Sequence, residues 1–255
     1  MTVGICDWGV GGLCLYKALR AGRPDLDIVY VADQGAGAYN LLSREALTER
    51  VEQVILTFRA MGIPRVVMAC DSASTVLDAI AVPGVNVTGV LEPTLRAMRH
   101  RSYREVGIIG GRRTILSGAY GRSLRKQRFM VVQRVSEDLA NLIESGQVNT
   151  PEIMESVRDM LEPLAKVDGL LLANTHYPLV ASSIREALPN TEIIDPSVFT
   201  VSELISDLPE FSGNEGKTTF YSTGNPMAMK ASARMLFGLN INVRSLSIAE
   251  PKLAA

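Results

Sequence analysis

The sequence is poor in residues that would place it in a special class. It has three cysteines, Cys6, Cys14 and Cys70, and their spacing suggests no pairs. A secreted disulfide framework needs a larger, regularly spaced set, so a reducing compartment is expected. The first residues run directly into an apolar strand, without the basic segment and long apolar run of a signal peptide. We therefore expect a cytoplasmic protein.

An excess of charge of one sign is also missing. The 26 Lys and Arg residues balance 27 Asp and Glu residues, and the formal net charge is −1. Proteins that bind nucleic acid or acidic membrane surfaces usually carry a basic excess, so neither partner is expected. No apolar run approaches the roughly 20 residues of a membrane span. No His, Cys or Asp cluster has the spacing of metal ligands, so no metal is expected.

What the sequence does have is a large apolar fraction, 47% of 255 residues, which suffices for one large domain or two ordinary ones. Short apolar runs alternate with amphipathic segments, which predicts an α/β fold with parallel sheets and helices on both faces. The strands are expected at 3–6, 28–32, 66–69, 87–90, 106–109, 130–135, 170–173, 192–194 and 218–222. The helices are expected at 13–20, 43–61 with Ser43 as N-cap, from near 74, 92–101, 136–145, 151–164, 177–188, 198–208 and 227–239, with a polar linker at 212–216 and a polar tail.

The chain also repeats itself. Val3-Gly4-Ile5 recurs as Val106-Gly107-Ile108, 103 positions later, and the strand ends at Cys70 and Asn174 lie 104 positions apart. The agreement of the two offsets predicts two similar parallel-sheet α/β domains related by pseudo-twofold symmetry, with the active site in the cleft between them. We expect the first domain to hold residues 1–92 plus about 200–255, and the second residues 93–199.

Polar residues follow three of the predicted strands, where an open parallel sheet binds its ligands. Cys70-Asp71-Ser72 follows the strand 66–69, and Asn174-Thr175-His176 follows the strand 170–173. The glycine-rich loop Asp7 to Gly12 follows the first strand, but it lacks the Lys-Ser/Thr of a P-loop and the glycine spacing of a dinucleotide site. A nucleotide cofactor is therefore not expected.

Four motifs carry a resemblance to a known family: Asp7-Trp8-Gly9-Val10-Gly11-Gly12-Leu13, Cys70-Asp71-Ser72-Ala73-Ser74, Ser117-Gly118-Ala119-Tyr120 and Thr175-His176-Tyr177-Pro178-Leu179. Their order and spacing, from about residue 3 to 195, resemble the glutamate racemase family of the aspartate/glutamate racemase superfamily. The resemblance implies an isomerase that needs no cofactor, a small carboxylic or amino acid as substrate, and a possible homodimer. Two cysteines in that family exchange the α-proton on opposite faces of the substrate.

The sequence departs from the family at the residues that matter most. Asn174 replaces the cysteine of the family's Gly-Cys-Thr-His-Tyr-Pro, and an amide transfers no proton at neutral pH. The family's Asp-Ser-Gly is Asp7-Trp8-Gly9, its Cys-Asn-Thr is Cys70-Asp71-Ser72, and its Pro-Tyr-Gly is Ala38-Tyr39-Asn40. A carboxylate at Asp71 would raise the pKa of the thiol and disfavour an anionic substrate. Ordinary two-cysteine glutamate racemisation is not expected.

The leading hypothesis is therefore a cofactor-independent enzyme with one catalytic cysteine, of racemase, isomerase or decarboxylase type. The residues expected to be catalytic are Cys70, His176 and Asp7, and those expected to bind substrate are Trp8, Tyr39, Asn40, Asp71, Ser72, Asn174 and Thr175. Glu144 aligns with an acidic residue that assists the second acid–base pair. The alternative hypothesis is a catalytically inactive homologue that binds a ligand or a partner protein.

Simpler interpretations exist for several of these residues. Cys70 could be a small buried apolar residue, like Cys6 and Cys14, which we assign to the core. His176 could be a hydrogen-bonded structural residue, and Glu144 a surface charge at a helix end. Trp8 could plug the site or form an apolar wall for an aromatic substrate.

Overall fold

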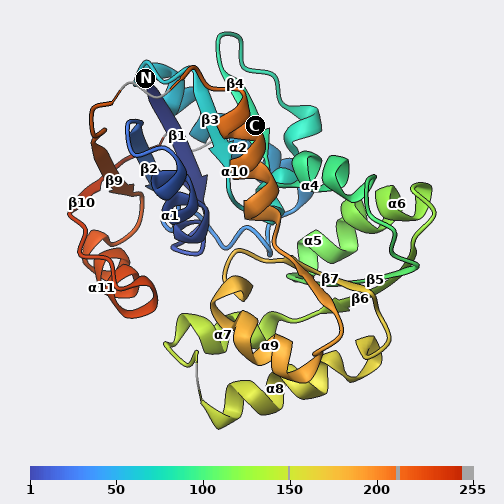
Figure 1. Ribbon diagram of the computed structural model, residues 1–255. Helices are drawn as coiled ribbons and strands as arrows, with labels where there is room; N and C mark the ends of the chain where they lie inside the picture. The colour runs from blue at the N-terminus through green and yellow to red at the C-terminus, as the bar shows by residue number, and fades with distance from the viewer. Residues whose placement is uncertain (149, 211–212, 249–255) are drawn as a thin grey trace.

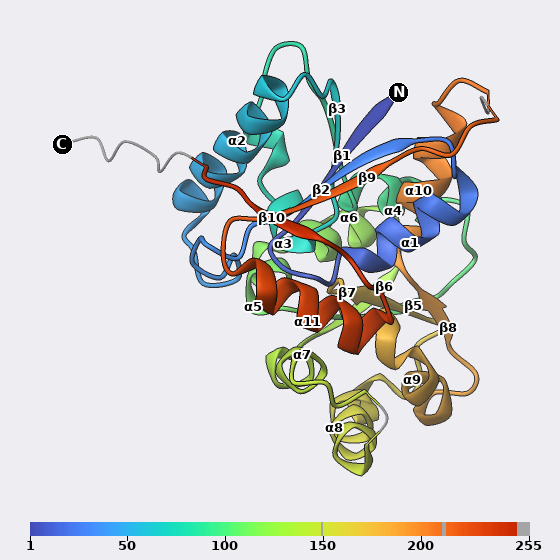
Figure 2. The same cartoon turned by 90° about the vertical axis from the view of Figure 1, so that its left-hand side faces the viewer.

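The computed structural model describes residues 1–148, 150–210 and 213–248, and these ranges contain two parallel β-sheets (Figures 1 and 2). The first sheet has the strand order β10-β9-β2-β1-β3-β4. Its strands are β1 (Thr2–Asp7), β2 (Asp27–Ala32), β3 (Arg65–Met68), β4 (Asn86–Gly89), β9 (Thr218–Ser222) and β10 (Val243–Ser245). Since β9 pairs with β2, the last part of the described chain returns to the sheet that the first part begins.

The second sheet has the strand order β6-β5-β7-β8. Its strands are β5 (Glu105–Gly110), β6 (Met130–Val135), β7 (Gly169–Ala173) and β8 (Glu192–Ile194). This order repeats β2-β1-β3-β4 of the first sheet, strand for strand, as the two offsets in the sequence predict. The expected fold class, two similar parallel-sheet α/β units, is confirmed. The domain boundaries near residues 92 and 200 stay a prediction.

Helices cover both faces of each sheet, because every strand of a parallel sheet must be buried on both sides. On the first sheet, α1, α10 and α11 pack on one face and α2 on the other; on the second sheet, α7, α8 and α9 oppose α4 and α6. Their bounds are α1 (Leu13–Gly22), α2 (Arg44–Ala60), α4 (Leu91–Met98), α6 (Ala119–Lys126), α7 (Glu137–Glu144), α8 (Pro151–Leu161), α9 (Ala181–Ala187), α10 (Pro196–Ser206) and α11 (Pro226–Phe237). None of the described helices is long and apolar enough to cross a membrane.

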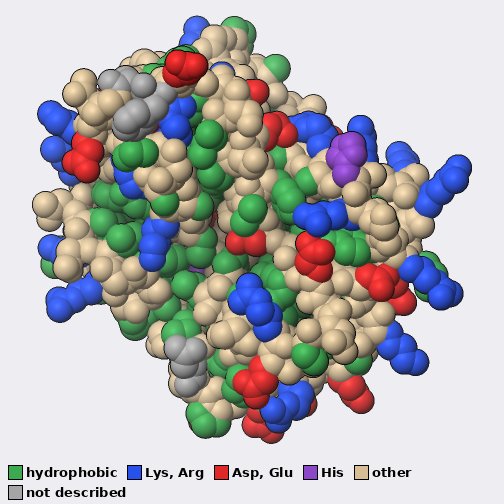
Figure 3. Space-filling view, viewed as in Figure 1, with side chains coloured by type: hydrophobic (Ala, Val, Ile, Leu, Met, Phe, Trp, Pro, Cys, Tyr) green, Lys and Arg blue, Asp and Glu red, His purple; other side chains and the backbone are tan. Residues whose placement is uncertain are grey.

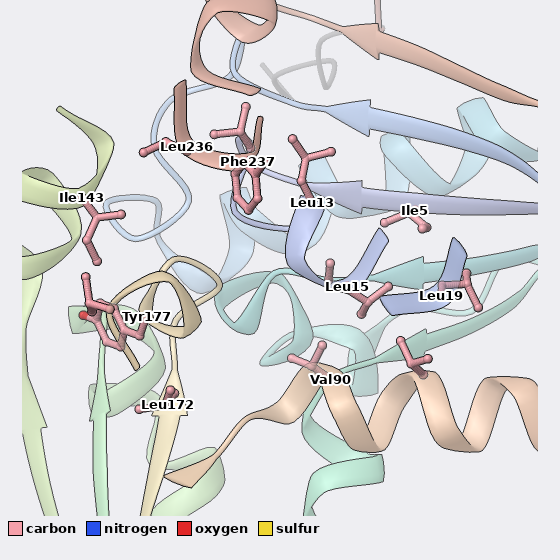
Figure 4. Packing of buried hydrophobic residues seen from close by; sticks show 14 of the residues in the cluster. Ile5, Leu13, Leu15, Leu19, Val90, Ile143, Leu172, Tyr177, Leu236 and Phe237 are labelled. Atoms are coloured by element: carbon pink, nitrogen blue, oxygen red, sulfur yellow. The ribbon is translucent and has the colours of Figure 1, made fainter. Parts of the chain in front are cut away.

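One hydrophobic cluster runs from the first sheet into the second. It joins Leu13 on α1 and Phe237 on α11 to Ile143 on α7 and to Tyr177 after β7. In Figure 4 the ring of Phe237 lies between Leu13 and the pair formed by Ile143 and Tyr177. The two sheets are therefore held together by a shared apolar core as well as by the connecting chain.

The structure corrects three of the expected elements. The helix expected from near Ser74 is α3 (Asp71–Ser74), with Cys70 as its N-cap, so it begins directly after the strand end. The helix expected at 177–188 is divided into η3 (Tyr177–Val180) and α9, because the backbone of Val180, with φ −111° and ψ 19°, is not α-helical. The expected polar tail contains β10, which pairs with β9. The first residue of the linker expected at 212–216 lies outside the described residues. The part of the expected tail beyond residue 248 also lies outside them.

Charged side chains of both signs occur on the face of the molecule that Figure 3 shows. On the face in Figure 3, Asp and Glu side chains are interspersed among Lys and Arg side chains, in keeping with the balanced charge of the sequence. No basic face of the kind that binds nucleic acid is visible there.

Candidate active site

A cavity of about 360 Å³ opens where β1, β3 and β7 end, between the two sheets. Parallel strands bring their carboxyl ends to one edge of each sheet, so residues that follow different strands meet there. The cavity is lined by the ten residues that the sequence singles out, Asp7, Trp8, Tyr39, Asn40, Cys70, Asp71, Ser72, Asn174, Thr175 and His176, together with Glu144. The structure brings these residues together, and their chemical roles stay a prediction.

Cys70 lies between β3 and α3 with 9% of its surface exposed. Burial raises the pKa of its thiol well above the ordinary value, and the negative charge of Asp7 adds to this. Backbone hydrogen bonds from Ala73 and Trp8 act in the opposite direction and lower the pKa. In the free protein the thiol is therefore protonated at neutral pH, which makes it a proton donor.

Asp7 connects the two halves of the site. Its Oδ2 accepts a hydrogen bond from the backbone N–H of Gly12 at 2.8 Å and one from the Thr175 hydroxyl at 3.5 Å. The loops come close here because position 11 has no side chain: a Cβ on Gly11 would lie 2.2 Å from the Thr175 Oγ1. Gly11 therefore permits the contact between the two loops, whereas a Cβ on Gly12 would meet Asp7, Tyr30 and Ala69 of the first half of the chain.

Asn174 follows β7, at the position where the resemblance to the family predicts a second cysteine. Its Oδ1 accepts a hydrogen bond from the backbone N–H of His176 at 2.9 Å, which holds the loop in a tight turn. His176 is 5% exposed, and its Nε2 lies 3.7 Å from Oε1 of Glu144. That Nε2 has no hydrogen-bond partner among the described residues.

Tyr39 and Asn40 enter the cavity wall from the loop after β2. The Tyr39 hydroxyl donates to Oδ2 of Asp33 at 2.6 Å, and Asp33 also binds the guanidinium of Arg50. The phenol is thus held by a buried ion pair. The Asn40 Nδ2 donates to Oε1 of Glu137 on α7 at 3.3 Å, so this residue contacts the second sheet's half of the molecule.

Trp8, Asp71 and Ser72 complete the set. Trp8 is half-buried, and within the described ranges its buried indole N–H finds no acceptor. Asp71 accepts a hydrogen bond from the Tyr120 hydroxyl at 2.9 Å, and the Ser72 hydroxyl lies 3.4 Å from that of Thr114. Both contacts reach across to the second half of the chain.

Sequence reasoning missed three groups of supporting residues. Glu137 and Thr114 sit in no quoted motif, and their positions depend on how α7 and α5 (Arg112–Ser117) pack over the site. Arg50, on the buried face of α2, gave no local signal. Tyr120 lies in the motif Ser117-Gly118-Ala119-Tyr120, so the sequence did contain a pattern from which it could have been selected as a site residue.

Comparison with known proteins then settles the family. The family model described as Asp/Glu/Hydantoin racemase matches residues 19–204. The glutamate racemase of Carboxydothermus hydrogenoformans is 31% identical over 251 residues, which cover 95% of this chain and 94% of that protein. The chain belongs to the Asp/Glu/Hydantoin racemase family. The family resemblance carried by the four motifs is thereby confirmed.

Solved racemase structures share the fold of this family member. Glutamate racemase isoform RacE1 from Bacillus anthracis superposes with a TM-score of 0.89 at 28% identity, covering 96% of this chain and 97% of that one. The glutamate racemase from Thermus thermophilus in complex with β-chloro-D-alanine gives 0.86 at 29% identity and covers 96% of each chain. The two-sheet architecture around the site is therefore that of glutamate racemases.

Among the described residues, no group of three or more His, Cys, Asp and Glu side chains is arranged to hold a metal ion.

Proposed function

We propose that this racemase-family protein is a cofactor-independent enzyme that transfers a proton at the α-carbon of a small carboxylic or amino acid through one cysteine, Cys70. The observation that carries the proposal is the pairing at the cavity: a thiol follows β3, and an amide, Asn174, stands at the matching end of β7. The complex of the Thermus thermophilus relative with β-chloro-D-alanine supports an amino acid as the class of ligand.

A single thiol suits chemistry in which one face of a carbanion is protonated. When a substituted malonate loses carbon dioxide, the electron pair of the broken C–C bond stays on the α-carbon. The Cys70 thiol then gives its proton to that carbon, and the resulting thiolate takes a proton from solvent. The raised pKa of the buried thiol supports this role, because the group is protonated when the reaction begins.

Removal of an α-proton needs the thiolate instead. An amino acid brings an ammonium group close to the thiol, and a positive charge favours the thiolate. Asp7 would hold that ammonium group. Cys70 would then remove and return the proton on one face, while inversion needs a second group such as His176, supported by Glu144.

Two-thiol glutamate racemisation is not proposed for this chain. Asn174 neither accepts nor donates a proton usefully at neutral pH, and its oxygen is already bound to the His176 backbone. The indole of Trp8 and the side chain of Asn40 line the cavity where the family has a serine and a glycine. The larger side chains of Trp8 and Asn40 leave less space for the side chain of a substrate, which favours an acid other than glutamate.

The test is proton NMR of the protein in deuterated buffer with D- and L-glutamate, D- and L-aspartate and phenylmalonate. We expect wash-out of an α-hydrogen without change of optical sign, or loss of carbon dioxide from phenylmalonate. In Cys70→Ala the rate should fall about 100-fold or more, the contribution of one acid–base group. Cys14→Ala is the matched control and should keep the rate. Inversion of an amino acid by the wild-type protein would contradict the single-thiol proposal.

One observation favours the alternative, an inactive homologue that binds a ligand. The Tyr39 hydroxyl and the Asn174 oxygen, both in the cavity wall, are engaged by protein groups and not free for a substrate. A panel acid that binds to the protein but shows neither exchange nor decarboxylation would support this alternative.

A further inference from the structure

Asp71 carries a buried carboxyl group that forms no ion pair with a described Lys, Arg or His side chain. It is 5% exposed, lines the cavity next to Cys70, and accepts a hydrogen bond from the Tyr120 hydroxyl on Oδ1 at 2.9 Å. Within the described ranges no Lys, Arg or His forms an ion pair with it. A buried charge without a partner is very unfavourable, so such a group keeps its proton instead.

Asp33, which follows β2 in the same sheet, shows the contrast. It is fully buried, yet its two oxygens accept hydrogen bonds from the Arg50 guanidinium and from the hydroxyls of Tyr39 and Thr223. These donors satisfy an ionised carboxylate. Asp71 has only neutral donors, the Tyr120 hydroxyl and its own backbone N–H, and no cation within the described part of the chain.

The other groups around Asp71 also oppose its ionisation. The negative charges of Asp7, at the end of β1, and of Asp195, directly before α10, both disfavour the carboxylate form of Asp71. Two hydrogen-bond donors favour the charged form, the Tyr120 hydroxyl from α6 and the backbone N–H of Asp71 itself. Arg44 of α2 is directed to the Thr75 carbonyl and to Asp78 instead. Burial first, then the two aspartates, raises the pKa of Asp71 to about 8 against the opposing Tyr120 bond.

We propose that Asp71 is a specificity-determining residue that works as a neutral acid, donating its carboxyl proton in a hydrogen bond to a carboxylate of the bound substrate. The proposal rests on the proposed function, because it takes the occupant of the cavity to be a carboxylic or amino acid. A carboxylic acid is a strong donor to a carboxylate.

This inference revises one expectation from the sequence. A carboxylate beside Cys70 was expected to disfavour an anionic substrate, but a protonated Asp71 attracts one at neutral pH. The attraction is lost when the proton is lost. Affinity for a carboxylate should therefore be constant at low pH and fall as the pH rises through about 8.

The test measures binding of D-glutamate and phenylmalonate by calorimetry at pH 6.5 and pH 9. For the wild-type protein we expect about a tenfold loss of affinity between the two, because most of Asp71 ionises in that interval. Asp71→Asn, which keeps a neutral donor, should bind the same acid equally at both values, and Asp71→Leu should bind it weakly at both. A wild-type pH dependence retained in Asp71→Asn, or no binding of either acid at any pH, would overturn the proposal.

A second variant separates a titrating carboxyl group from a merely structural one. Asp195→Asn removes a neighbouring negative charge but keeps the acceptor for the backbone N–H of Ser197, which Asp195 Oδ1 binds at 2.8 Å. The midpoint of the affinity loss should move to lower pH because Asp71 then ionises more easily. An unchanged midpoint counts against the inference. Failure of the proposed catalysis is seen separately, as binding with this pH profile but without α-hydrogen exchange or decarboxylation.

Discussion

At the scale of single residues, the amide at position 174 changes what the cavity can do. Its oxygen accepts a hydrogen bond from the His176 N–H at 2.9 Å, so the side chain holds the loop after β7. The opposite strand end carries the Cys70 thiol, and Asp7 and Thr175 join the two loops. Under the proposed function, only one of these two strand ends supplies a group that transfers a proton.

Restoring the missing thiol tests whether the rest of the pocket still fits glutamate. In Asn174→Cys the turn loses one hydrogen bond, so we expect a loss of about 1 kcal/mol in the free energy of unfolding. We expect no glutamate racemisation, because Trp8 and Asn40 still line the cavity. Polarimetry with D-glutamate checks this, and Asn174→Ala serves as the control for the lost bond. Turnover in the cysteine variant would show that Asn174 alone blocks the reaction.

The stability of the protein should depend on pH through Asp71. Its pKa is raised to about 8 in the folded protein, while an unfolded aspartate ionises near 4. Between these values the folded state holds a proton that the unfolded state has lost, so stability falls as the pH rises. Asp71→Asn lacks this effect. Relative to the wild type, it should gain about 1.4 kcal/mol for each pH unit from 5 to 7, measured by urea denaturation. An equal difference at both pH values would argue for an ionised Asp71.

At the scale of elements, the contact between the loop after β1 and the loop after β7 depends on a missing side chain. A Cβ on Gly11 would lie 2.2 Å from Thr175 Oγ1, whereas one on Gly9 would meet nothing closer than 3.7 Å. The two loops carry Asp7 and Thr175, which form a hydrogen bond across the site.

Gly11→Ala should therefore push these loops apart. We expect a loss of about 1–3 kcal/mol in the free energy of unfolding, the usual cost of overpacking, and weaker binding of any acid in the cavity. Gly9→Ala is the matched control and should change both quantities little. Denaturant titration and calorimetry measure the two effects. Equal behaviour of the two variants would mean that the loops adjust without cost.

Most elements were predictable because their signals are local. Ser43 caps α2 by accepting the Ala46 N–H, as its position before an amphipathic run indicates, and β6 has the predicted bounds. β10 was not predictable, because its three residues are half-buried or exposed and become a strand only by pairing with β9. The helix after Cys70 was predicted to begin near Ser74, whereas α3 begins at Asp71 and ends at Ser74, since four residues are too short a pattern to fix the bounds of a helix.

The candidate site followed from sequence to the extent that its residues end strands. Cys70 and Asn174 both lie directly after an apolar run, and the parallel topology brings such positions together. Glu137 and Arg50 could not be found in this way. Their contacts with Asn40 and Asp33 join segments that are far apart in the chain, and no local sequence pattern predicts such contacts.

At the scale of the whole molecule, one apolar cluster spans both sheets. Phe237 on α11 belongs to the same cluster as Leu13 on α1 and Ile143 on α7 (Figure 4). Because residues of both halves form this one cluster, we expect the two sheets to unfold in a single cooperative transition.

Phe237→Ala should destabilise the whole protein by about 3–5 kcal/mol, the usual cost of removing a buried phenylalanine. Met227→Ala, on the same helix with 70% of the methionine exposed, should stay within about 0.5 kcal/mol of the wild type. Unfolding followed by Trp8 fluorescence reports on the first sheet, and circular dichroism reports on both. Separated transitions in the wild-type protein would contradict the shared core.

The strand order also decides when the protein can finish folding during translation. Strand β2 has β9 as its outer neighbour, and the whole second sheet is encoded between β4 and β9. A nascent chain that has produced the first four strands therefore leaves the ribosome with an unpaired, hydrogen-bonding edge on β2. Until residues 218–222 emerge, that edge is free to pair with a neighbouring chain, so slow or truncated synthesis of this protein should favour aggregation over folding.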